Sequence, residues 1–173
     1  MSISLYDISI RNYLQILSSI SAVLDKGKAH AKENNIELSE LVETKLVDDM
    51  APLRFQLISV AHHSLGAING LKAGVFGPPS SFPNLDYDGL HGLVTDAKNA
   101  LEKLSEKEIN ALEGGDMRFE MGDFVLPFTA ETFIQSFSLP NFYFHATTTY
   151  DILRMKGVPL GKMDFLGAMR VKT

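Results

Sequence analysis

The fold is decided by residues 140–157, which read PNFYFHATTTYDILRMKG. A helix ends naturally at Gly157, because glycine adopts the left-handed conformation of a helix C-terminus without strain. Pro159 follows two positions later and cannot continue a helix. We therefore expect a long last helix from Pro140 to Lys156.

Polar side chains line one face of this expected helix. Asn141, His145, Thr148 and Ile152 recur at steps of four, three and four, the spacing that places side chains on one helix face. Buried polar groups need hydrogen-bond partners, so this row is unexpected on the inner face of a helical protein. Two interpretations follow: a satisfied hydrogen-bond network in the core, or a ligand pocket built between facing helices.

Further helices are expected upstream, because apolar residues recur there at steps of three and four, as on the buried face of an amphipathic helix. Three of them are long and two are short, and they cover about residues 4–34, 52–73, 89–104, 36–49 and 105–112. Long helices joined by connections of uneven length indicate an all-α four-helix bundle. Nothing in the sequence suggests a second domain, so a single domain over 1–173 is expected.

A small β-hairpin is expected before the last helix. Residues 117–121 alternate between apolar and polar, and a similar run at 124–128 follows the Gly122-Asp123 pair. An isolated two-stranded ribbon is marginally stable, so this hairpin must pack on the helices. The flanking segments are expected to be a short helical approach over 129–137, interrupted at the following proline, and an extended tail over 160–173.

Composition narrows the classes of function. The 173 residues carry a net charge of -5, which argues against the basic surface typical of nucleic-acid binding. The sequence has no cysteine, which excludes disulfides, thiol nucleophiles and iron–sulfur clusters. Its apolar runs are far shorter than the ~18 residues of a membrane span, and its start does not read as a signal peptide. We therefore expect a cytoplasmic protein that binds neither nucleic acid nor membrane.

The remaining histidines differ in what their positions suggest. His30 lies on a polar stretch and is expected at the surface, whereas His91, near the start of the third long helix, is expected either at the surface or in a hydrogen bond between helices. His62 and His63 lie in the middle of the second long helix. Helical spacing places His62 on the flank of the inward stripe, whereas His63 points close to the opposite direction and is expected to be exposed. His62 is then either a boundary residue bonded to a neighbouring helix or a metal ligand.

The last-helix stretch resembles a known superfamily. His145 is followed by Leu153 and Arg154, eight and nine positions later, and by Gly157 after twelve, which is the last-helix signature of the DinB/YfiT-like superfamily. A closer resemblance, to an uncharacterised branch that is a domain family of unknown function, rests on the blocks PNFYFH at 140–145, GKMDF at 161–165 and DMAPLRFQ at 49–56.

The resemblance implies a DinB-like four-helix bundle that is often a homodimer. Better-known members of the superfamily bind a divalent metal through three histidines, one on the second helix and two that lie four apart on the last helix. Some members are thiol S-transferases or thiol-dependent isomerases, and others are treated as metal-dependent hydrolases. The implied cofactor is a divalent metal, zinc or nickel.

Carried over by position, His145 matches the second histidine of the last-helix pair, and Asn141 stands where the first belongs. The ligand on the second helix would be His62, with His63 as the alternative. Thr148 stands where many members have a glutamine. An amide oxygen is a poor substitute for imidazole on zinc or nickel. The resemblance thus implies a weakened metal site at His62 and His145, with Asn141 and Thr148 as neighbouring cofactor-binding residues.

Three hypotheses for the function follow. The first is a metal-dependent enzyme, a hydrolase or thiol transferase, that acts on a small molecule through a metal-bound water or thiolate. The second is a metal-free dimeric module for small-molecule binding or stress response, in which the same pocket holds an organic ligand. The third is a purely structural dimer, with His145 in a core hydrogen-bond network.

Overall fold

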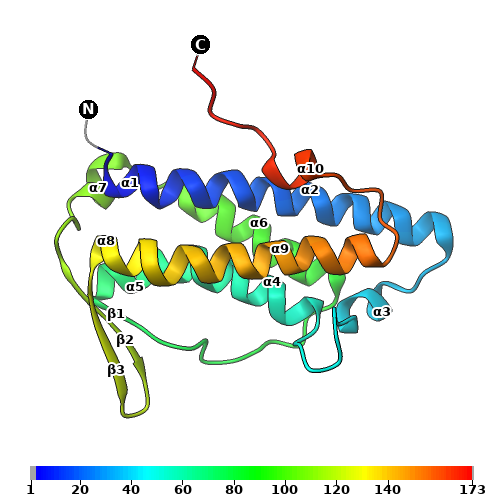
Figure 1. Ribbon diagram of the computed structural model, residues 1–173, viewed down its shortest axis with the longest axis horizontal. Coiled ribbons are helices and arrows are strands. Elements are labelled where there is room, and N and C mark those ends of the chain that lie inside the picture. Colours follow the sequence, from blue (N-terminus) through cyan, green and yellow to red (C-terminus); the bar gives the residue numbers. More distant parts are fainter. Residues whose placement is uncertain (1–2, 173) are drawn as a thin grey trace.

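The computed structural model describes residues 3–172. This part of the chain is mostly helical and carries a small three-stranded sheet at one end (Figure 1). The elements in chain order are α1 (Leu5–Ile8), α2 (Ile10–Asn34), α3 (Leu38–Glu43), α4 (Leu53–Ala61), η1 (His62–Gly66), α5 (Ala67–Ala73), β1 (Val75–Phe76), α6 (Tyr87–Glu102), α7 (Glu106–Asn110), β2 (Asp116–Met121), β3 (Phe124–Thr129), α8 (Ala130–Phe133), η2 (Ile134–Ser138), α9 (Leu139–Met155) and α10 (Lys162–Leu166).

The long helices pack through their buried faces. α2 contacts α6 and α9, and α4 contacts the same two helices. Along α2, buried residues recur every three or four positions from Ile10 to Ala31, as the sequence pattern predicts. Gly27 lets α6 approach closely, since a Cβ at this position would lie 2.4 Å from the hydroxyl oxygen of Tyr87. That hydroxyl donates a 2.8 Å hydrogen bond to the Leu24 carbonyl.

Two of the long helices contain a π-turn, labelled η1 and η2. α4 continues through η1 into α5, and α8 continues through η2 into α9. The expected interruption at Pro140 is therefore wrong, because the last helix runs without a break from Ala130 to Met155. Proline has no N–H to bond to the preceding turn, and the wider π-turn just before it accommodates this loss. Single π-turns occur often at functional sites.

The predicted hairpin is present, since β2 pairs antiparallel with β3 around the Gly122-Asp123 turn. A third strand, β1, was not expected; it is only two residues long and pairs in parallel with β2. An all-α description is therefore too simple. In this register Phe76 of β1 stands opposite Phe119 of β2, with the two ring centroids 6.4 Å apart. The pair presents two aromatic rings toward the helices.

The last helix ends at Gly157 as predicted. Gly157 has a φ of 89°, and the N–H of Val158 donates to the carbonyl of Leu153, which is the bond of a Schellman motif. The extended tail is a partial misprediction, because α10 forms within it and packs on α2. The Gln15 side-chain amide donates to the Leu166 carbonyl at 2.9 Å. Residue 173, the last of the predicted tail, lies outside the described residues.

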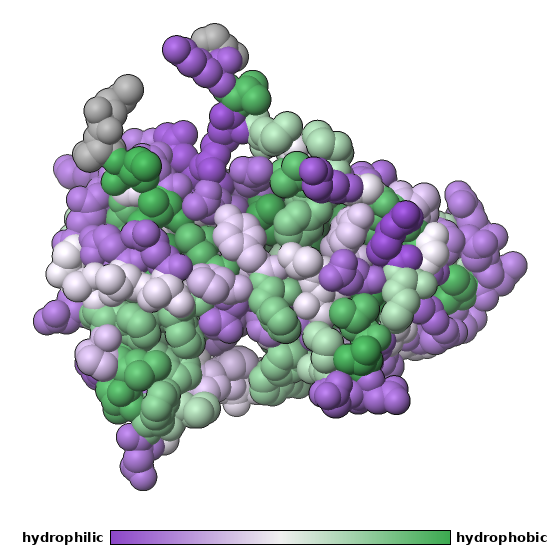
Figure 2. Space-filling model, in the orientation of Figure 1, coloured by the Kyte–Doolittle hydropathy of each residue, from purple (hydrophilic) through white to green (hydrophobic). Residues whose placement is uncertain are grey.

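The visible surface is mixed, with hydrophobic side chains gathered over the hairpin (Figure 2). Met121, Phe124 and Val125 are exposed there. Across residues 3–172, no helix combines the length and the apolar character that a membrane crossing requires.

Candidate functional site

A cavity of about 300 Å³ lies between the second and last long helices, with the sheet and the loop after β1 as its remaining walls. Three of the residues singled out from the sequence, His62, Asn141 and His145, line it. Thr148 does not. The complete lining is Phe55, Ser59, His62, His63, Phe76, Gly77, Pro78, Pro79, Phe82, Phe119, Phe137, Asn141 and His145.

His145 is held by a buried glutamine. Its Nδ1 lies 2.8 Å from Oε1 of Gln56, and Nε2 of Gln56 donates to the Ala51 carbonyl at 2.9 Å. A carbonyl only accepts, so the bond to Ala51 fixes which end of the Gln56 amide is nitrogen. Its oxygen therefore faces His145, and Nδ1 of His145 must carry the proton. Nε2 of His145 then keeps its lone pair, and it has no hydrogen-bond partner among residues 3–172.

His63, rather than His62, lies against His145. The rings of His63 and His145 are 5.8 Å apart between centroids and nearly parallel, with an angle of 17° between their planes. The expected exposure of His63 is therefore wrong, because this side chain is partly buried and lines the cavity. The prediction took one apolar stripe as the only inward face, whereas α4 is also buried on the face that carries Gln56 and Ser59, seven and four positions before His63. Nδ1 of His63 is buried without a partner.

His62 holds the wall of the cavity instead of facing His145. Its Nε2 donates to the Gly77 carbonyl at 2.8 Å, and its ring stacks on Phe76 with centroids 4.4 Å apart. Its Nδ1 lies near the next turn of its own helix, where a Cβ on Gly66 would lie 3.0 Å from it. His62 thus attaches the loop after β1 to η1.

Asn141 and Thr148 both use their side chains within the last helix. Nδ2 of Asn141 donates to the Phe137 carbonyl at 2.7 Å, which leaves the amide oxygen as its remaining polar group at the cavity. Thr148 is buried, and its hydroxyl donates to the Phe144 carbonyl at 2.8 Å. Of these two residues, Asn141 alone can meet a ligand in the cavity.

Ser59 is a cavity residue that the sequence analysis did not single out. It is 5% exposed, yet its hydroxyl makes no hydrogen bond to another residue in 3–172. The other buried serines and threonines all donate to a carbonyl, and they are Ser9, Ser19, Ser64, Ser138, Thr148 and Thr149. Among the buried serines and threonines of the described chain, Ser59 is therefore the one whose hydroxyl has no protein partner, and its oxygen stays open to solvent in the cavity.

A spacing pattern could have found these residues. Gln56, Ser59 and His63 lie three and four positions apart, so they share one face of the second long helix. This is the same kind of polar row that Asn141 and His145 form on the last helix.

The walls of the cavity are aromatic. Phe137 lies 4.8 Å from Phe119 and 5.9 Å from His63 between ring centroids. On the opposite side Phe55 stacks on Phe82 at 5.2 Å and meets the His145 ring edge-on at 5.8 Å. Prolines from the loop after β1 form a further wall of this cavity, which is open to solvent on one side. The cavity thus presents a few polar atoms among aromatic side chains.

Burial keeps the imidazoles of the site uncharged. Loss of hydration lowers the pKa of His145 to about 4. The same effect, with smaller contributions from His62 and His145, lowers the pKa of His63 to about 3. Burial also lowers the pKa of His62, although its bond to the Gly77 carbonyl opposes the shift. Since the lining includes no Asp, Glu, Lys or Arg, the described cavity carries no charge near pH 7.

The three-ligand metal site that the DinB resemblance implies does not fit these residues. Within residues 3–172, no group of three or more His, Cys, Asp or Glu side chains could hold a metal ion. Nε2 of His62 is bonded to Gly77, and Asn141 supplies an amide in place of the missing imidazole. Two imidazoles and an amide without a carboxylate make a poor donor set for zinc or nickel.

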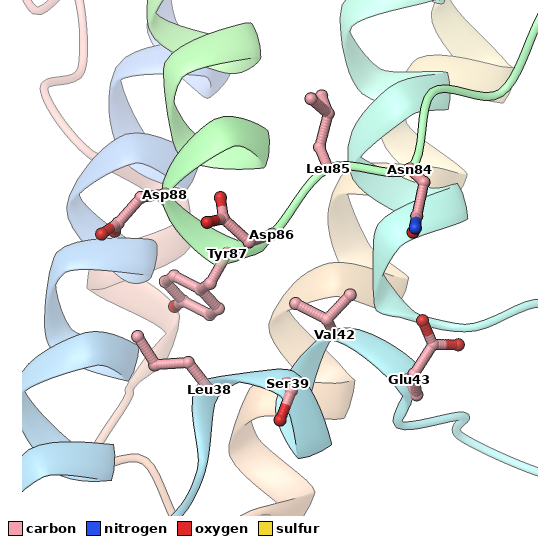
Figure 3. A pocket seen from close by; sticks show the side chains of 9 residues that line it. All are labelled: Leu38, Ser39, Val42, Glu43, Asn84, Leu85, Asp86, Tyr87 and Asp88. Carbon is pink, nitrogen blue, oxygen red and sulfur yellow. The ribbon is translucent and has the colours of Figure 1, made fainter.

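A second cavity, of about 390 Å³, lies between α3 and the start of α6 (Figure 3). Three of its lining residues are acidic, but each already has a partner. Glu43 pairs with Arg54 at 3.4 Å, Asp88 pairs with Lys28 at 2.7 Å, and Asp86 accepts from the Gly89 N–H as the helix cap. Each of these three acidic side chains therefore has a structural role in an ion pair or a helix cap.

Comparison with solved structures identifies the class of fold. A crystal structure of a DinB family member protein from Shewanella denitrificans, at 1.83 Å resolution, matches with a TM-score of 0.79 and 26% sequence identity. The match covers 98% of this chain and 95% of that chain. The fold is therefore DinB-like, as the last-helix resemblance predicted.

The particular family follows from the sequence. The chain belongs to DUF1993, a family defined by a domain of unknown function, and the family model matches residues 5–166. No curated protein matches the chain.

Proposed function

We propose that this protein is a DinB-like four-helix bundle that binds a small, largely apolar organic molecule in the cavity between α4 and α9, without a metal. The observation that carries the proposal is the combination of aromatic walls with polar atoms that have no protein partner. These atoms are the Ser59 hydroxyl, Nε2 of His145 and Nδ1 of His63. Ligand sites are typically apolar concavities with a few placed polar groups.

The size and charge of the cavity support this proposal. An apolar cavity of about 150 Å³ is enough to hold benzene, so a cavity of about 300 Å³ has room for a ligand of one or two rings. A charged ligand would lose its hydration in a lining that offers no counter-charge. The poor metal donor set favours this function over a metal-dependent enzyme.

Titration with toluene, a neutral apolar probe, tests the proposal. We expect amide chemical-shift changes in ¹H–¹⁵N NMR spectra at Phe55, His63 and Phe137, together with a rise in melting temperature. The variant Ser59→Leu fills the cavity and should abolish these shifts. The matched control Ser64→Ala lies on the same helical stretch, has its hydroxyl bonded to Val60, and should retain them. The proposal is contradicted if neither toluene nor a similar one-ring aromatic probe binds at its solubility limit.

A second titration, with zinc and nickel, separates this function from the metal-dependent enzyme. Metal-free binding predicts no change in melting temperature with either ion. Stabilisation by a metal that disappears in His145→Ala would replace the proposal with a metal-dependent function. The homodimer that the resemblance implies belongs to the same proposal, and light scattering on the purified protein measures it.

A further inference from the structure

The geometry of the cavity points to a specific class of ligand: a flat, uncharged aromatic molecule that bears a hydroxyl group, a phenol. The hydroxyl donates to Nε2 of His145 and accepts from the hydroxyl of Ser59. This inference rests on the proposed function, since it names the ligand class of the same cavity.

The ligand must donate a hydrogen bond to His145 because of the hydrogen bonds that fix the His145 ring. The Ala51 carbonyl orients the Gln56 amide, and Gln56 in turn holds the proton of His145 on Nδ1. His145 lines the cavity, and because Nδ1 is bonded to Gln56, Nε2 is the nitrogen left as a pure acceptor for a ligand. A ligand that buries this atom without donating to it would leave a buried acceptor unsatisfied, so the site discriminates against molecules without an N–H or O–H.

The donating group of the ligand should be a hydroxyl because Ser59 offers a second hydrogen bond. Its side chain lies one helical turn after Gln56 and Phe55, both of which contact His145. The residue is buried, but its hydroxyl makes none of the carbonyl bonds of the other buried hydroxyls, and its oxygen stays open to the cavity. A ligand oxygen that donates to His145 has lone pairs left to accept from Ser59. A hydroxyl meets both requirements with one atom, whereas an aromatic N–H meets only the first.

The preference for a neutral ring comes from the walls. Phe55, Phe82, Phe119 and Phe137 supply aromatic faces and edges around the polar atoms, and such groups pack well against another ring. No charged side chain among the described lining residues compensates a carboxylate or an ammonium group. At pH 7.5 a phenol with a pKa of about 10 remains neutral.

Three probes of similar size test the inference by ligand-observed NMR at pH 7.5: phenol, anisole and benzoate. Phenol and anisole share the ring and the oxygen, but anisole cannot donate. We expect phenol to bind at least about tenfold more tightly than anisole, which corresponds to one hydrogen bond to a buried acceptor. Benzoate should bind more weakly than either, because its charge is not compensated.

Two variants test which residues cause the preference for phenol over anisole. His145→Leu should weaken phenol to the affinity of anisole while leaving anisole within about threefold. Ser59→Ala should weaken phenol about three- to tenfold and anisole by no more than that, because the ether oxygen can also accept from Ser59. The control Ser64→Ala should affect neither probe, because its hydroxyl is bonded to the Val60 and Ala61 carbonyls. Melting temperatures of all variants confirm that they fold.

An independent measurement tests the hydrogen-bond chain without any ligand. Long-range ¹H–¹⁵N correlation of the imidazole nitrogens should show His145 as the Nδ1–H tautomer, and Gln56→Leu should remove this fixed preference. The inference is overturned if phenol and anisole bind equally, if benzoate binds best, or if His145 carries its proton on Nε2. In each of these cases toluene binding leaves the proposed function intact. If toluene, phenol and anisole all fail to bind, both the inference and the proposed function are overturned.

Discussion

Ser138 Oγ donates a 2.7 Å hydrogen bond to the main-chain carbonyl of His63 and thereby joins the two π-turns. The only hydroxyl proton of Ser138 is used in this bond, so the Tyr13 hydroxyl, also 2.7 Å away, must donate to Ser138. A π-turn leaves main-chain carbonyls without the usual i+4 partner. Ser138 therefore fixes the backbone at His63, and the side chain of His63 lines the cavity.

The first prediction concerns this link. Ser138→Ala leaves both the Tyr13 hydroxyl and the His63 carbonyl buried without partners, so the free energy of unfolding should fall by about 1–3 kcal/mol. Urea denaturation measures the change. Ser136→Ala, an exposed serine on the same π-turn, is the control and should change stability by less than about 0.5 kcal/mol. Equal stabilities of the two variants would show that the link contributes nothing.

The second prediction compares two helical glycines. A Cβ at Gly27 would lie 2.4 Å from the Tyr87 hydroxyl, whereas a Cβ at Gly92 would meet no atom within 4 Å. Gly27→Ala should therefore lower the free energy of unfolding by about 1–3 kcal/mol through overpacking. Gly92→Ala should raise it by about 0.5–1 kcal/mol, because alanine loses less backbone entropy in a helix. Thermal unfolding of both variants measures these two changes in the free energy of unfolding, which should have opposite signs.

Much of the fold was predictable because local signals agreed with the packing. Apolar residues at steps of three and four predict α2, and Gly157 predicts the end of α9. Both are local preferences that agree with the tertiary structure. β1 was not predictable in this way, because two residues carry no periodicity and the strand exists only through its pairing with β2. Pro140 misled the prediction because a π-turn, which depends on tertiary contacts, absorbs it.

The candidate site was predictable in part. The polar row of the last helix correctly placed Asn141 and His145 on a cavity. His62 is a partly buried, hydrogen-bonded residue at the edge of the inward stripe, but the expected exposure of His63 is wrong, because α4 is also buried on the face that carries Gln56 and Ser59. The partner of His145 could not be assigned from spacing on one helix, since the Gln56 contact joins residues 89 positions apart.

The third prediction concerns pH. Burial lowers the pKa of His145 to about 4 and that of His63 to about 3, whereas both titrate near 6.5 when unfolded. The unfolded state therefore binds more protons below pH 6.5, and stability must fall as the pH falls. Each histidine contributes a slope of up to about 1.4 kcal/mol per pH unit.

Urea denaturation between pH 7.5 and 4.5 measures this slope above the range in which most carboxylates titrate. The double variant His63→Gln, His145→Gln should flatten the dependence, whereas His30→Gln, which lies outside the cavity on α2, should not. A slope that is unchanged in the double variant would mean that other groups set the acid sensitivity.

The last prediction concerns the loop between β1 and α6, which forms one wall of the cavity. Three contacts attach this loop to the second long helix: His62 to the Gly77 carbonyl at 2.8 Å, Arg54 to Asn84 at 3.1 Å, and the stack of Phe55 on Phe82. His62→Phe preserves a ring against Phe76 but removes the hydrogen bond.

We expect His62→Phe to cost only about 0.5–1.5 kcal/mol of global stability, because one partly exposed hydrogen bond is lost. Amide hydrogen exchange in residues 77–86 should nevertheless rise several-fold, since local opening depends on the few contacts that hold the segment. Adding Phe82→Ala should raise exchange further in the same residues and leave α2 protected. If exchange rises equally across α2 and the loop, the variant has lowered global stability, and His62 does not act as a local attachment.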